Sequence, residues 1–70
     1  MNQREKIKEY MRNYGSISTL EAFRDLGITR LGARIMEIER QGTPINRKTE
    51  YGQNRFGEKV HYTRYAIAND

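Results

Sequence analysis

The sequence contains no cysteine and no tryptophan, and it has only one proline and one histidine in 70 residues. Without cysteine, neither a disulfide framework nor a thiolate metal site is possible, and the composition fits a reducing compartment. No apolar run approaches the roughly 18 residues that span a bilayer, and no apolar segment follows the first four residues. We therefore expect a cytoplasmic protein that has no signal peptide and does not contact a membrane.

The residues that usually carry catalysis are also scarce. His61 falls within an expected strand, and no serine or acidic residue stands at a diagnostic spacing from it. There is no glycine-rich phosphate loop and no cluster of metal ligands, and a chain of this length has no room for a substrate-sized pocket. We expect the protein not to be an enzyme, with no catalytic residue, no metal ion and no cofactor.

Charge, by contrast, is plentiful and unevenly placed. The chain has 13 basic and 9 acidic residues, a net charge of +4. Between residues 46 and 64, five residues are basic and two are acidic, so most of the excess lies in the last third of the chain. Such a balance favours a polyanionic partner. A basic surface that serves only solubility is the alternative, and the charge count alone does not reject it.

Two short helices are predicted in the first part of the chain, over about residues 3–14 and 19–26. Asn2 with Glu5, and Ser18 with Glu21, have the spacing of a capping box at a helix start. Glycines end both helices. The side chains expected to point inward are Ile7, Tyr10, Met11 and Tyr14 on the first helix, and Leu20, Phe23 and Leu26 on the second.

A third helix is predicted over about residues 30–41, with Thr29 as its N-cap. Its inner face carries Leu31, Ile35 and Ile38. Only a short turn around a glycine separates this helix from the second one, so the two helices must cross steeply. Two helices joined in this way form a helix-turn-helix unit.

The remaining segment, over about residues 45–68, is predicted to be a β-hairpin. Pro44 breaks the helical pattern, and the residues after it are β-tolerant and alternate in character. The turn falls within residues 52–59, with Gly57 as the expected position of positive φ. Ile45, Tyr65 and Ile67 are expected to close the open end of the helical core. The sequence thus predicts one mainly α domain with a β-hairpin, a three-helix winged helix-turn-helix.

In a helix-turn-helix, the N-terminal part of the second helix of the unit meets base edges in the major groove. The outward face of the third helix therefore supplies candidate contacts with double-stranded DNA, against the alternative of an ordinary solvated face. These candidates are Thr29, Arg30, Gly32, Ala33, Arg34, Glu37 and Arg40. For Arg34, a phosphate contact and an ion pair with Glu21 or Asp25 are both open.

Two further regions supply candidate contacts with phosphate. The free amide groups at the start of the second helix, near Ser18 and Thr19, can bind an anion. The hairpin contributes polar and basic side chains: Arg47, Lys48, Asn54, Arg55, Lys59 and Arg64. Phe56, at the expected tip, either stacks on a partner or folds back onto the hairpin.

The run from residue 15 to residue 35, GSISTLEAFRDLGITRLGARI, resembles the small winged helix-turn-helix domain common in phages and prophages. Later parts of the family pattern appear as GTPI at residues 42–45, NRFG at 54–57 and YAI at 65–67. Gly32 and Ile38 depart from the pattern, where alanine or serine and leucine are more usual. The resemblance implies a DNA-binding protein.

The leading hypothesis is a regulator of a phage or mobile element that reads the major groove with the third helix. The hairpin would lie along the backbone or in the minor groove. An excisionase-like architectural protein and a phage inhibitor that binds a host protein are the alternatives. A homodimer or a protein partner is left open.

Overall fold

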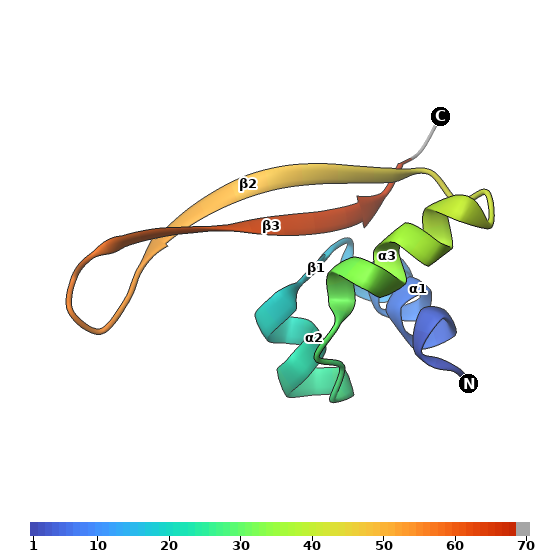
Figure 1. The fold of residues 1–70 in the computed structure, drawn as a ribbon, viewed down its shortest axis with the longest axis horizontal. Helices are drawn as coiled ribbons and strands as arrows, with labels where there is room; N and C mark the ends of the chain where they lie inside the picture. The colour runs from blue at the N-terminus through green and yellow to red at the C-terminus, as the bar shows by residue number, and fades with distance from the viewer. Residues whose placement is uncertain (69–70) are drawn as a thin grey trace.

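The computed structural model describes residues 1–68, and it forms three helices and three strands (Figure 1). A twisted antiparallel sheet of order β1-β3-β2 lies across one side of the helices. This arrangement is the single-domain winged helix-turn-helix that the sequence predicts. The elements, in chain order, are α1 (Gln3–Tyr14), β1 (Ile17–Ser18), α2 (Thr19–Leu26), α3 (Leu31–Arg40), β2 (Ile45–Gln53) and β3 (Lys59–Ile67).

Local side-chain hydrogen bonds fix the starts of the first two helices. The Asn2 side chain accepts a hydrogen bond from the backbone N–H of Glu5. Ser18 and Glu21 form both bonds of a capping box at the start of α2. Gly27 ends α2 with φ at 69°, a left-handed conformation that glycine adopts without strain. The capping pattern in the sequence therefore marks both helix starts.

The start of α3 differs from the prediction. Arg30, not Thr29, is the N-cap residue, and it makes no side-chain capping bond. The helix begins at Leu31, and a buried residue stands on each side of the turn that leads into it. Ile28 is held in the core and bonds through its N–H to the carbonyl of Ala22, and Leu31 is buried three residues later. Thr29 lies exposed between these two buried residues.

One apolar core lies between the three helices and the sheet. Five partly buried side chains complete it at its edges, among them Ile45, Tyr65 and Ile67, so the prediction that these three close the core is confirmed. Tyr14, by contrast, is 72% exposed. The fully buried apolar residues are Ile7, Met11, Ile17, Ala22, Ile28, Leu31, Ile35 and Ile38.

Helix α2 meets this core through Ala22, whereas Leu20 and Phe23 are 68% and 60% exposed. The expectation that both point inward is therefore wrong. At about 100° per residue, Leu20 lies about 160° and Phe23 about 100° from Ala22 around the helix. The small side chain of Ala22 lets this short helix approach the core closely, and the two larger residues stay outside. Leu26, only about 40° from Ala22, packs against the core as predicted.

The hairpin is long and projects well beyond the helical body (Figure 1). Strands β2 and β3 pair in register from Ile45 opposite Ile67 to Gln53 opposite Lys59. Strand β1 pairs with β3 at Tyr65 and Arg64 only. Beyond these two residues the hairpin is a two-stranded ribbon with no third strand.

The connecting loop, residues 54–58, is shorter than the predicted turn. The Asn54 side chain accepts hydrogen bonds from the N–H groups of Phe56 and Glu58, and its amide donates to the Glu58 carboxylate. Gly57 has φ at 75°, as expected. Phe56 is 86% exposed, so it does not fold back onto the hairpin.

We expect Gly32→Ala to raise the free energy of unfolding by about 0.5–1 kcal/mol, because a helix that contains glycine is less stable than the same helix with alanine at that position. A methyl group added there would meet nothing nearer than the Tyr65 hydroxyl oxygen at 4.0 Å. Urea titration measures the change. Gly27→Ala is the matched control and should destabilise, since its φ is positive. A destabilising Gly32→Ala would contradict the open space found around this residue.

Candidate nucleic-acid interface

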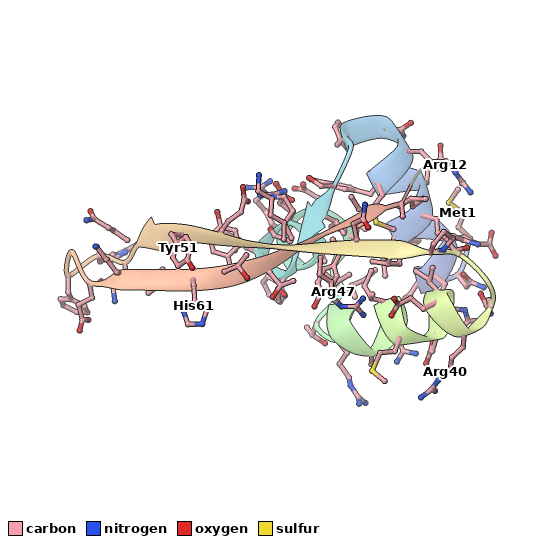
Figure 2. The ribbon with its side chains drawn as sticks, turned by 90° about the horizontal axis from the view of Figure 1, so that it is seen from above. Met1, Arg12, Arg40, Arg47, Tyr51 and His61 are labelled. Atoms are coloured by element: carbon pink, nitrogen blue, oxygen red, sulfur yellow. The ribbon has the colours of Figure 1, made fainter. Side chains whose placement is uncertain are left out.

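The outward face of α3 carries an exposed Gly32, Met36 and Arg40, together with a partly exposed Ala33. Their arrangement follows from the burial of Leu31, Ile35 and Ile38 on the opposite side. Seen from above, α3 lies to one side of the hairpin, and Arg40 points away from the molecule (Figure 2). Gly32, Met36 and Arg40 of the face predicted to read DNA are therefore open to solvent.

Glu37, on the flank of this face, is held by two arginines. Its carboxylate accepts hydrogen bonds from Arg34 at 2.7 Å and from Arg4 of α1 at 2.9 Å. These bonds lower the pKa of Glu37. Of the two alternatives left open for Arg34, the ion pair with Glu21 or Asp25 is wrong, because Glu37, one helical turn away on α3, is its partner.

Arg47 ties the root of the hairpin to α3. Its guanidinium donates to both carboxylate oxygens of Glu39, at 2.6 and 2.9 Å, and stands 5.6 Å from the centre of the Tyr65 ring. The hydrogen bonds lower the pKa of Glu39 and raise that of Arg47. Both acidic side chains of α3 are thus occupied by arginines of this chain.

Arg64 forms a second junction, between the sheet and the start of α2. It donates to Glu21 at 2.7 Å and to the Ser16 hydroxyl at 3.2 Å, and it pairs with Glu50 across the hairpin. Its pKa is raised by the hydrogen bonds to Glu50 and Glu21. Burial acts to raise the pKa of Glu21, but the bonds from Arg64 and Ser18 outweigh it, and the net shift is downward.

The same junction changes the predicted anion site at the start of α2. The Ser18 N–H donates to the Glu21 carboxylate at 3.0 Å, and Ser18 itself is buried. That amide is therefore already occupied. Thr19, the other predicted residue, is exposed at the first position of the helix.

The hairpin presents two different faces, because residues directly opposite each other in the ladder point to the same side. The α3-side face consists of Thr49, Tyr51, Gln53, Lys59, His61 and Thr63, and it contains no acidic residue. It shares its side with Arg47 and Tyr65, which contact α3, and Figure 2 shows Arg47 and His61 pointing to the side where α3 lies. The α2-side face consists of Lys48, Glu50, Gly52, Val60, Tyr62 and Arg64.

The predicted cations fall into two groups. Arg34, Arg47 and Arg64 are held in ion pairs. The others form no ion pair with any residue from 1 to 68: Arg30, Arg40, Lys48, Arg55 and Lys59. Cations without an ion pair therefore stand near both ends of α3 and along the hairpin.

One surface was missed in the sequence, and the expectation that a chain of this length has no room for a substrate-sized hollow is wrong. A groove of about 600 Å³ runs between α2 and β3, and Thr29 lies on its lining. Its apolar lining comes from Leu20, Phe23 and Tyr62, which are exposed, and from the buried Ile28. Ala22 was the signal in the sequence that could have revealed this groove. Because Ala22 is the residue of α2 that faces the core, Leu20 and Phe23 must face outward.

The winged helix-turn-helix domain family matches residues 2–70, nearly the whole chain. The protein therefore belongs to this family, and a domain of this class implies DNA as its partner. No curated protein and no solved structure matches the chain. Within residues 1–68, no helix is long and apolar enough to cross a membrane, and no group of three acidic or histidine side chains could hold a metal ion.

We expect the free energy of unfolding to fall below about pH 5 more steeply in the wild type than in Glu21→Gln. The pKa of Glu21 is lowered in the folded protein, so its pairing stabilises the fold above the ordinary carboxyl pKa. This contribution is lost as the pH falls through the folded-state pKa. At neutral pH the variant should be less stable by about 1–3 kcal/mol in urea titration.

A double-mutant cycle assigns this effect to Arg64. In an Arg64→Met background, Glu21→Gln should lower the free energy of unfolding clearly less than in the wild type, because the cation that pairs with the carboxylate is absent. Equal costs in the two backgrounds would show that the pair contributes nothing to stability.

Proposed function

We propose that this protein binds double-stranded DNA with the outward face of α3 in the major groove and the α3-side face of the hairpin on the neighbouring backbone or minor groove. The observation that carries the proposal is charge placement. Both acidic side chains of α3, Glu37 and Glu39, are paired with arginines of this chain, and the adjoining α3-side face of the hairpin carries no acidic residue. A phosphate backbone lying across both surfaces meets no free carboxylate on either of them.

Base contacts fall, in this proposal, to the N-terminal part of α3. Arg30 is exposed there and unpaired within residues 1–68, and arginine is suited to bidentate contact with guanine. Gly32 and Ala33 are small, so the helix backbone can approach the base edges closely. Glu37 and Arg34 hold each other and are assigned a supporting role, and Arg40 at the far end of α3 is assigned to phosphate.

The biological role we propose is regulation of transcription in a phage or mobile element, on the strength of the resemblance of residues 15–45 to phage and prophage domains. Selection of bound sequences from a random duplex library tests it. Recovery of a defined motif supports a sequence-specific regulator. Duplex binding weaker than millimolar at low salt would instead favour an inhibitor that binds a host protein.

An architectural, excisionase-like role is the second candidate, and the length of the hairpin favours it. The ribbon projects far beyond the helices (Figure 1), so in the proposed complex it would reach DNA outside the segment under α3. A circular-permutation bending assay on the selected site separates the two roles. A strongly bent complex supports the architectural protein, and an unbent one supports a plain regulator.

Lys59→Ala is expected to weaken duplex binding several-fold and to make the slope of log K against log salt concentration less steep by about 0.9, the value for one lost phosphate contact. Lys48→Ala is the matched control, since Lys48 lies on the same ribbon but on the α2-side face. It should leave affinity and slope nearly unchanged. Equal losses for the two variants would contradict the proposed orientation of the hairpin.

Arg30→Ala is expected to lower affinity for the selected site by about 1–3 kcal/mol, and affinity for random duplex much less. Competition binding with the two duplexes measures the difference. If both affinities fall equally, Arg30 holds a phosphate and does not read a base.

A further inference from the structure

The distal part of β3 has an open edge. Strand β1 covers β3 only at Tyr65 and Arg64, so the backbone groups of Lys59–Thr63 that point away from β2 have no strand beside them. An isolated two-stranded ribbon is marginally stable in water, and an uncovered edge is a template for another strand. This edge of β3 is therefore available for backbone pairing with another strand.

The two edges of the ribbon differ in how they are protected. Across the ribbon from Lys59–Thr63, the segment Thr49–Gln53 of β2 carries the charged Glu50 and a glycine, Gly52, and both kinds of residue disfavour edge pairing. In Lys59–Thr63 the one charged residue, Lys59, stands at the end of the segment. The segment Val60–Thr63 of β3 reads Val-His-Tyr-Thr, with no lysine, arginine, acid, glycine or proline. Val60 and Tyr62 are 39% and 40% exposed. The open edge is thus also the edge with strong β propensity.

We propose that Lys59–Thr63 pairs with the same segment of a second copy of the chain, antiparallel, about a twofold axis at His61. In this register His61 lies opposite His61 of the second copy, and Lys59 lies opposite Thr63. The two hairpins then form one four-stranded ribbon with the protected β2 strands outside. A contact of this kind uses the same surface on both copies and closes on itself, so it stops at the dimer.

The end of this ladder explains the exposed apolar residues of α2. Beyond Thr63, β1 occupies the edge of β3 and leads directly into α2. The loop of the second copy, residues 54–58, must therefore leave the sheet at the start of α2. Its Phe56, 86% exposed in the single chain, arrives beside Leu20 and Phe23 on the groove between α2 and β3. Each copy supplies one aromatic tip and one apolar groove.

The same symmetry places both reading helices on one side. Directly opposed residues of paired strands point to the same face, so the α3-side faces of the two hairpins become continuous. Tyr65, which lies beneath Gly32, is four residues from the axis, about 13 Å along the strand. The starts of the two α3 helices then stand roughly 27 Å apart along the ribbon, and each helix runs outward from there, which approaches the 34–36 Å of one DNA turn.

Cysteine cross-linking tests the register, because the chain has no cysteine of its own. In the dimer, two copies of His61→Cys bring their Cα atoms to about 4.5–5.5 Å, within the range of a disulfide. Tyr51→Cys is the matched control, since Tyr51 faces His61 across the hairpin but stands on β2. Its two copies are separated by three strand spacings, about 14 Å. Rapid oxidation of the first variant alone is expected, and equal rates would overturn the register.

Sedimentation of the wild-type chain without DNA tests the dimer itself, independently of the function proposed above. We expect twice the chain mass at high micromolar concentration, and a monomer at about millimolar concentration would overturn the proposal. His61→Lys, which adds two charges at the axis, should sediment as a monomer. Its circular dichroism spectrum should show that it is folded. Thr49→Lys adds the same charge on the outer strand of the same face and should remain a dimer. If His61→Lys is folded and still dimeric, the proposed pairing is wrong.

Discussion

The three helices do not close their own core, and the rest of the structure depends on how β3 closes it. Tyr65 and Ile67 must face the helices, and because side chains alternate along a strand, the orientation of every other residue of β3 follows. Arg64 is forced to the opposite side, where it meets Glu21 at the start of α2. Thr63 and His61 share the side of Tyr65, and this fixes which face of the projecting hairpin continues the surface of α3.

Internal ion pairs then decide which charges remain for a partner. A net charge of +4 shows only that cations outnumber acids. In the fold, each of three glutamates forms an ion pair with an arginine of another element: Glu37 with Arg4, Glu39 with Arg47, and Glu21 with Arg64. These pairs join α1 to α3, the hairpin to α3, and the hairpin to α2. Apart from Lys6 and Lys8 of α1, the cations that form no ion pair within residues 1–68 stand near the two ends of α3 and on the hairpin. The same arginines therefore hold the fold together and remove negative charge from the proposed DNA surface.

Local signals predicted most of the fold, and long-range contacts account for the errors. Capping bonds act within a few residues, so Asn2, Ser18 and Gly27 mark helix ends correctly. The inward face of α2 was wrong because apolar spacing favoured Leu20 and Phe23, while close packing against the core selected Ala22. The roles of Arg47 and Arg64 needed the third dimension, since Arg64 and Glu21 stand 43 residues apart in the chain.

By itself, the sequence determined the three helices, the hairpin and the winged helix-turn-helix class, because caps, glycine stops and apolar periodicity are properties of short segments. It also placed most of the excess positive charge in the last third of the chain. Only the tertiary structure decided which of those cations are free, that the hairpin has one acid-free face, and that β3 has an uncovered edge. These features arise from strand register and from contacts between distant residues, neither of which is encoded in any single stretch of the chain.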